Sequence, residues 1–167
     1  KELGQMFGMR SAMNFLSSYG LTPAEGVRAW KKWGPITVDV VKDNPYLLCV
    51  EEIGVEFKRA DEIALSVGIE ADSGKRLFGA ASHVLRHNLK NGHTCLARQT
   101  VVQLVMRLTG VEEAAIEADI DQRIEEEELF SVQKNREFLF LPSMYNAERY
   151  IAMRLSMMLQ NRFFVSR

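Results

Sequence analysis

The chain has 167 residues, of which 47% are hydrophobic, and a formal net charge of −1. This size supports a buried core in one or two small domains, and the charge excludes a strongly basic nucleic-acid binder. No apolar run is long enough to span a bilayer and no signal-peptide pattern is present, so we expect no membrane partner. Cys49 and Cys95 are too few for a disulfide framework and have apolar neighbours, which predicts reduced, largely buried thiols in a cytoplasmic protein.

The first two predicted helices are joined by a glycine turn. Apolar residues at helical spacing predict a helix over residues 5–18, with Gly20 as its stop. Thr22 and Glu25 form a capping-box pattern with proline at the first helical position, which predicts a second helix up to Gly34. The result is a helix-hairpin-helix candidate. Its second helix carries cations that could face DNA phosphates: Arg28, Lys31 and Lys32.

Two tryptophans lie on the same predicted helix. Trp30 and Trp33 could act as stacking platforms for bases. Their spacing among apolar residues is more typical of core positions, and we favour that interpretation.

A second hairpin candidate follows. Residues 35–43 are expected to form a short helix whose inward side chains are Ile36, Val40 and Val41. Pro45 can open another short helix, and Gly54 can take the positive φ that turns the chain into a helix from Phe57 to about Val67. The start of that helix offers free backbone N–H groups beside Lys58 and Arg59, a suitable seat for a phosphate.

The second half of the chain has the pattern of a winged helix: three helices followed by a β-hairpin. Asp72 or Ser73 is expected to cap the first of these helices, and Leu89 and Leu108 are expected to be buried on the first and second. The predicted helices are residues 75–91, 98–108 and 112–127, the predicted strands are residues 129–132 and 138–141, and a last helix is predicted over residues 145–161.

Charge is distributed unevenly over this half. Residues 71–111 carry six Lys or Arg against one Asp, whereas residues 112–130 carry one Arg against nine Asp or Glu. The helix that would enter the major groove in a helix-turn-helix therefore lies in the acidic segment, where duplex phosphates would repel it. We expect this part to be a structural spacer or a protein-docking element, although the run Glu125–Glu128 could also be simply a solvated face.

Catalytic and metal-binding patterns are weak. No Gly-x-x-x-x-Gly-Lys-Ser/Thr loop occurs, so we expect this chain neither to bind nor to hydrolyse ATP and assign it no catalytic residue. His83, His87, His93 and Cys95 could together ligate zinc, but their spacing matches no compact zinc signature, and we expect no metal site.

Several short motifs carry a resemblance to a known family. They are Asn44-Pro45-Tyr46, Ile53-Gly54, Phe57-Lys58-Arg59-Ala60-Asp61 and Gly92-His93-Thr94. In order and spacing, from about Phe15 to Leu159, the chain resembles the accessory N-terminal region of RecD/TraA-type superfamily 1 DNA helicases, often labelled exodeoxyribonuclease V alpha subunit. Two residues depart from the family pattern: Glu56 replaces its second glycine and Arg59 its threonine. A carboxylate at position 56 would oppose a phosphate.

The resemblance implies a mostly α fold in three parts. These are tandem helix-hairpin-helix units over residues 1–72, a winged-helix-like subdomain with a small β-hairpin over residues 73–142, and the first helix of a motor domain over residues 143–167. The chain would then be an excised fragment that lacks the motor.

The function implied is that of an accessory DNA-binding region in an ATP-dependent 5′-to-3′ DNA helicase of repair or recombination. ATP and magnesium would belong to the motor domains. The partners would be those motor domains and the backbone of single-stranded or junction DNA, bound without sequence specificity. The alternative is a protein-interaction scaffold with little DNA contact. The DNA-binding candidates are Gly20, Thr22, Arg28, Lys31, Lys32, Gly54, Lys58 and Arg59.

Overall fold

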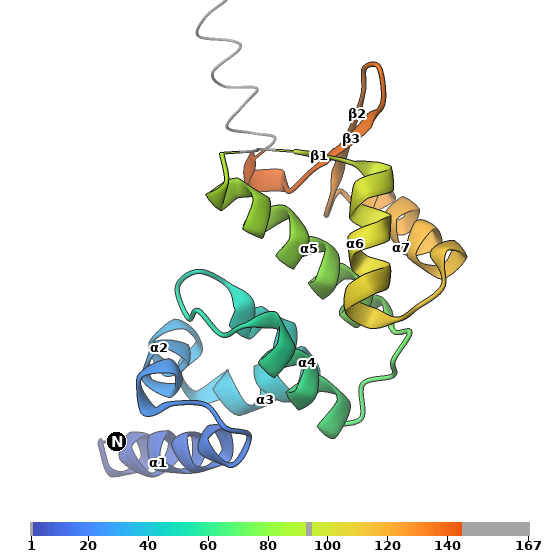
Figure 1. Ribbon diagram of the computed structural model, residues 1–167. Helices are drawn as coiled ribbons and strands as arrows, with labels where there is room; N and C mark the ends of the chain where they lie inside the picture. Colours follow the sequence, from blue (N-terminus) through green and yellow to red (C-terminus); the bar gives the residue numbers. More distant parts are fainter. Residues whose placement is uncertain (1, 93–94, 145–167) are drawn as a thin grey trace, which may run out of the picture. The chain divides into compact units, whose positions relative to one another are not determined.

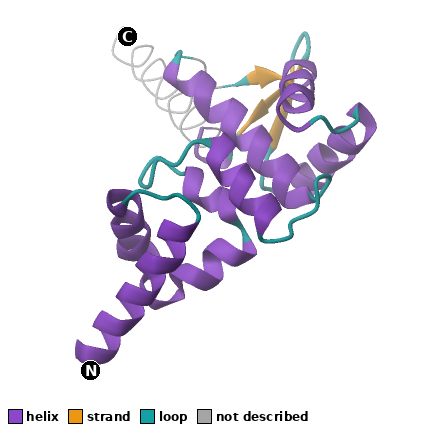
Figure 2. Cartoon of the chain, turned by 60° about the horizontal axis from the view of Figure 1, so that its bottom comes forward, coloured by secondary structure: helices purple, strands orange, loops and turns teal. Residues whose placement is uncertain are grey.

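The computed structural model describes residues 2–92 and 95–144. It is mostly helical with one small antiparallel sheet, as expected from the sequence (Figures 1 and 2). The chain divides into two compact units, residues 1–83 and 84–167, so the division falls inside helix α5 (Gly74–Lys90). The domain boundaries expected at residues 72 and 142 stay predictions, and the helix expected over residues 145–161 lies outside the described residues.

The described part of the first unit, residues 2–83, contains helices and no strand. The capping box at Thr22 and the proline at the first helical position fix the start of α2, as predicted. Asn44 caps the short helix that Pro45 opens, since its Oδ1 accepts a hydrogen bond from the Tyr46 amide at 3.2 Å. The elements are α1 (Glu2–Ser18), α2 (Pro23–Trp33), η1 (Gly34–Ile36), α3 (Thr37–Asp43), η2 (Pro45–Cys49), α4 (Phe57–Ser66) and the start of α5.

Two glycine turns give this unit its tandem-hairpin form. Gly20 joins α1 to α2 with φ of +86°, and Gly54 leads from η2 into α4 with φ of +78°. Both values lie in the left-handed region that glycine adopts without a Cβ penalty. A buried apolar residue follows each glycine: Leu21 donates its amide hydrogen to the Leu16 carbonyl at 3.2 Å, and Val55 donates to that of Leu48 at 3.1 Å. Each turn is therefore anchored to the helix before it.

One predicted core position of the first unit is wrong. Ile36 is 55% exposed, whereas Thr37 is buried and its hydroxyl donates to the Gly34 carbonyl at 2.6 Å. Ile36 ends a 3₁₀ turn, in which each residue rotates further about the axis than in an α-helix, so the face extrapolated from α spacing does not apply. Trp30 and Trp33 are both half-buried.

The second unit has the winged-helix connectivity. The sheet order is β1-β3-β2, and all pairings are antiparallel: Leu96 lies opposite Leu139, and Phe130 opposite Phe140. The β-hairpin was predicted within a residue at each end, whereas the two-residue strand β1 was not. The elements after α5 are β1 (Leu96–Ala97), α6 (Arg98–Thr109), α7 (Glu113–Glu125), β2 (Phe130–Gln133) and β3 (Glu137–Phe140).

Two helix ends and both thiols differ from the predicted burial. Leu89 is 45% exposed and Leu108 is 40% exposed, and each lies in the last turn of its helix. Periodicity predicts which side of a helix is covered, but not how far along the helix the cover extends. Cys49 and Cys95 form no disulfide within the described residues, and both are only half-buried. Within the described part of the chain, no helix combines the length and apolar character needed to cross a membrane.

Candidate nucleic-acid interface

The start of α2 is closed by its own cap. Thr22 Oγ1 accepts from the Glu25 amide at 3.3 Å, and Glu25 Oε2 accepts from the Thr22 amide at 3.3 Å. Pro23 has no N–H, so Ala24 supplies the one first-turn amide of α2 left without an acceptor in the described structure. The first hairpin thus has few backbone donors to offer a phosphate.

The start of α4 is open by comparison. Glu56 occupies the cap position, but its side chain makes no capping hydrogen bond, and the first helical bond runs from the Ala60 amide to the Glu56 carbonyl at 3.0 Å. The amides of Phe57, Lys58 and Arg59 have no acceptor among the described residues. Backbone donors at a helix N-terminus favour an anion, and the exposed Lys58 side chain adds a positive charge. The exposed Glu56 carboxylate beside these amides would repel a bound anion.

The Arg59 side chain, on the second hairpin, forms hydrogen bonds with the first hairpin. Its Nη1 donates to Glu25 Oε1 at 2.8 Å, and its Nη2 donates to Glu25 Oε2 at 2.9 Å and to the Gly20 carbonyl at 2.6 Å. The hydrogen bonds from Arg59 are the largest cause of a pKa of Glu25 below the ordinary value. Glu25 is therefore held as a carboxylate between the two hairpins.

The cations of α2 likewise reach the second hairpin. Arg28 Nε donates to the Ile53 carbonyl at 3.0 Å, and Lys32 forms a surface ion pair with Glu52. Lys31 and Lys58 are exposed, and neither forms an ion pair with a residue in ranges 2–92 and 95–144. Of the predicted DNA-binding cations, these two are the ones whose side chains have no hydrogen-bond or ion-pair partner among the described residues.

The structure brings together most of the predicted residues, with a different division of roles. Gly20 and Gly54 form the turns, and Arg28, Lys32 and Arg59 link one hairpin to the other. Glu25 was predicted only as a capping residue, and its partnership with Arg59 was missed. The signal available in the sequence was a spacing of 34 residues, which relates Gly20 to Gly54 and also Glu25 to Arg59.

Comparison with known families identifies this double hairpin. Residues 5–95 match the family model described as the ATP-dependent RecD2 DNA helicase HHH domain. The chain belongs to this family. The match covers more than half of the chain and includes both glycine turns, all of α2 to α5 and the links between the hairpins. The RecD-type resemblance of the N-terminal region is thereby confirmed.

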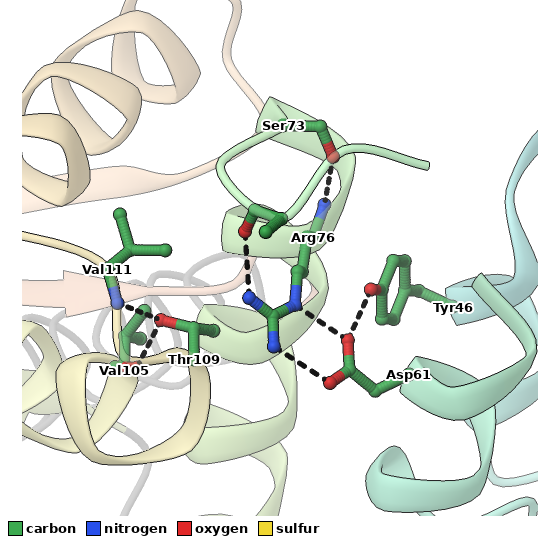
Figure 3. A network of polar contacts seen from close by, with 8 residues as sticks. Tyr46, Asp61, Ser73, Arg76, Val105, Thr109 and Val111 are labelled. Carbon is green, nitrogen blue, oxygen red and sulfur yellow. Dashed lines mark hydrogen bonds and ion pairs between the residues drawn. The ribbon is translucent and has the colours of Figure 1, made fainter. Parts of the chain in front are cut away.

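A buried polar network supports the second hairpin of the RecD2 HHH domain (Figure 3). Asp61 on α4 accepts from the Tyr46 hydroxyl at 2.6 Å and from Arg76 Nε and Nη2 at 2.8 and 3.0 Å. Arg76 Nη1 also donates to the Ala71 carbonyl at 2.8 Å, and Ser73 Oγ caps α5 by accepting from the Arg76 amide. The network joins η2, α4 and α5, so it fixes the helix whose start carries the open amides.

This network shifts the titration of its members. Burial raises the pKa of Asp61, but hydrogen bonds from Arg76 and Tyr46 lower it by more, and the net pKa lies below the ordinary value. Burial, followed by the hydrogen bond to Asp61, raises the pKa of Tyr46. Asp61 is accordingly ionised and Tyr46 neutral at physiological pH.

An aromatic stack continues from the same place. The Tyr46 and Phe57 rings stack with centroids 5.6 Å apart, and the Phe57 and His83 rings with centroids 5.3 Å apart. Phe57 is the first residue of α4, so the stack holds the N-terminus of this helix from the inside of the RecD2 HHH domain.

The acidic α7, which follows the RecD2 HHH domain in sequence, is partly neutralised by two arginines. Arg98 bonds Glu117, Asp121 and Glu137, and Arg123 pairs with Asp119, Glu126 and Glu128. The carboxylates that are exposed without such a partner in the described structure are Glu112, Glu113, Glu125 and Glu127.

Among the described residues, no group of three or more His, Cys, Asp or Glu side chains is placed to hold a metal ion. His93, one of the four side chains considered for zinc, lies outside them.

Proposed function

We propose that the double hairpin is a DNA-backbone-binding accessory region of an ATP-dependent DNA helicase, without sequence specificity. The observation that carries this proposal is the open N-terminus of α4 in a chain of the RecD2 helicase HHH family. The uncapped amides of Phe57, Lys58 and Arg59 suit phosphate oxygens, and contacts of this kind are blind to base identity. Lys58 and Lys31 supply exposed positive charge.

The wider role is part of the same proposal, and the family match together with the absence of a phosphate-binding loop in the sequence supports it. The ATP-binding and magnesium-binding residues would lie in motor domains that work with this region, and this chain would not hydrolyse ATP itself. Unwinding in the 5′-to-3′ direction, a task in DNA repair or recombination and a cytoplasmic setting complete the proposal. We also propose that the parent helicase is related to the exodeoxyribonuclease V alpha subunit.

The second candidate is a scaffold that holds the motor domains or a partner protein and barely contacts DNA. Two observations favour it: Arg28, Lys32 and Arg59 are engaged within the double hairpin, and the exposed face of α7 is acidic. DNA phosphates would be repelled from that face.

Binding of fluorescently labelled single-stranded DNA, followed by anisotropy at low and rising salt, separates the two candidates. For a DNA-binding region we expect a linear loss of log affinity with log salt, and similar affinities for unrelated sequences. Changing Lys31→Ala together with Lys32→Ala should weaken binding of all sequences alike. If no DNA binding is detected at low salt, the scaffold function is supported and the DNA-binding function is contradicted.

A matched pair of variants tests the seat at α4. Glu56→Gln removes the carboxylate beside the open amides. We expect this variant to bind DNA about two- to fivefold more tightly, which is the affinity equivalent of one charge at a helix N-terminus. Glu70→Gln makes the same chemical change at an exposed site in the loop after α4 and serves as the control. Equal affinities of both variants would place DNA contact elsewhere.

A further inference from the structure

Glu25 and Arg59 hold the same place in two repeats of one motif. Each is the third residue of the helix that follows a glycine turn, and the spacing of 34 residues between them is also the spacing of Gly20 and Gly54. Their ion pair therefore joins equivalent points of the two hairpins.

The backbone contacts around this pair cross over between the hairpins. Arg59, on the second helix of the second hairpin, donates to the Gly20 carbonyl in the first turn at 2.6 Å. Arg28, on the second helix of the first hairpin, donates to the Ile53 carbonyl in the second turn at 3.0 Å. Each hairpin thus holds the turn of the other. We call Arg28, Arg59, Glu25 and the carbonyls of Gly20 and Ile53 the hairpin brace.

The guanidinium of Arg59 makes three hydrogen bonds within the double hairpin. Both of its Nη atoms are engaged with Glu25, whose side chain is only 10% exposed, and Nη2 also binds the Gly20 carbonyl. A phosphate that took over these Nη donors would leave a mostly buried carboxylate without its cation, which is costly. The same two side chains also stabilise each other's charged forms: the pKa of Arg59 is raised, first of all by its hydrogen bond to Glu25.

The geometry points to Arg59 and Arg28 as positioning residues of the DNA site: they set the separation of the two hairpin turns and do not themselves bind phosphates. This inference rests on the proposed DNA-binding function. It assigns phosphate contact to the α4 amides, Lys58 and Lys31, and it makes Glu25, a carboxylate, necessary for binding a polyanion.

The direction in which Glu25→Gln changes DNA affinity distinguishes a positioning role of Arg59 from direct phosphate binding. Glu25→Gln keeps the capping box, since glutamine serves at this position as well, but removes the charge that holds Arg59. If the brace positions the turns, Glu25→Gln and Arg59→Gln each weaken DNA binding about three- to tenfold, and the double variant is no worse than either. If Arg59 is a phosphate ligand, Glu25→Gln frees it and tightens binding, which would overturn the inference.

The conservative variant Arg59→Lys adds a readout at constant charge. Lysine lacks the fork that reaches Glu25 and the Gly20 carbonyl together, so a brace predicts weakened binding, whereas a simple phosphate ligand predicts binding like that of the unchanged chain. Arg10→Gln and Glu70→Gln, at exposed positions, are the matched charge controls for Arg59→Gln and Glu25→Gln.

A distance measurement keeps the inference separate from DNA binding itself. Pulsed electron paramagnetic resonance can measure the separation of the two turns. Spin labels are attached at Ser18→Cys and Glu51→Cys, and the native thiols are removed by Cys49→Ala and Cys95→Ala. We expect one narrow distance distribution, broadened by Arg59→Gln in folded protein. A broadening without any DNA binding would support the brace and contradict the proposed function. An unchanged distribution in protein that binds DNA would overturn the brace and leave the function standing.

Discussion

Asp61 shows how one residue ties the double hairpin together. It accepts hydrogen bonds from Tyr46 and Arg76, and the Arg76 side chain is only 8% exposed. Asp61→Asn keeps the shape but leaves a nearly buried guanidinium without its counter-charge, so we expect a loss of about 2–4 kcal/mol in the free energy of unfolding, measured in urea. Tyr46→Phe removes the hydroxyl that donates to Asp61 but leaves the ion pair of Asp61 with Arg76 in place, so it should cost about 1 kcal/mol. Equal losses for the two variants would contradict this account.

The pH dependence of the Asp61 contribution has a definite sign. The net pKa of Asp61 in the folded chain is lowered, because its hydrogen bonds from Arg76 and Tyr46 outweigh burial, the largest single effect, which raises it. A carboxyl group with a lowered folded pKa stabilises the fold above its unfolded pKa, about 3.9, and this stabilisation disappears as the pH falls through the folded pKa. The stability gap between the unchanged chain and Asp61→Asn should therefore be full at pH 7 and shrink below about pH 4. Urea titrations across this range measure it.

At the level of the helices, local chemistry made most boundaries predictable. The capping box at Thr22 and the cap before α5 each span three residues, and each glycine turn depends on one residue, so the sequence alone locates them, with the cap before α5 predicted at Asp72 or Ser73 and found at Ser73. The links Arg28 to Ile53 and Arg59 to Gly20 span 25 and 39 residues, and no local pattern encodes such contacts. This is why the cations were found as candidates for the site while their roles within it were not.

Two glycines in helices should respond to alanine in opposite directions. At Gly79 on α5 an added Cβ would lie 2.6 Å from Tyr46 Cγ, which forces η2 and α5 apart, whereas at Gly8 on α1 it would make an ordinary contact of 3.6 Å with Trp30. Alanine is a better helix former than glycine by about 1 kcal/mol. We expect Gly8→Ala to stabilise by up to that amount, and Gly79→Ala to destabilise by on the order of 1–2 kcal/mol because overpacking exceeds the gain. Thermal unfolding of both variants is the measurement, and a stabilised Gly79→Ala would show that η2 can retreat.

On the scale of the whole chain, charge separates the regions that DNA could approach. Residues 112–130 carry nine acidic side chains against one Arg, and Glu112, Glu113 and Glu125 are exposed at or within α7. The wing between β2 and β3 carries its own exposed cations, Lys134 and Arg136. A winged helix that read DNA in the usual way would present α7 to the groove and the wing to the backbone, and the carboxylates of α7 oppose both contacts.

Two double variants that each remove two positive charges test whether DNA binds at the hairpins or at the wing. Lys31→Ala with Lys58→Ala removes two exposed cations from the double hairpin, and Lys134→Ala with Arg136→Ala removes two from the wing. If single-stranded DNA binds at the hairpins, the first pair should lower the salt slope by about 1.4, because each neutralised phosphate contributes roughly 0.7. The second pair should change affinity by less than about twofold, since α7 already keeps phosphates away. Anisotropy titrations at several salt concentrations measure both quantities, and a larger loss from the wing pair would move the DNA site to the second unit.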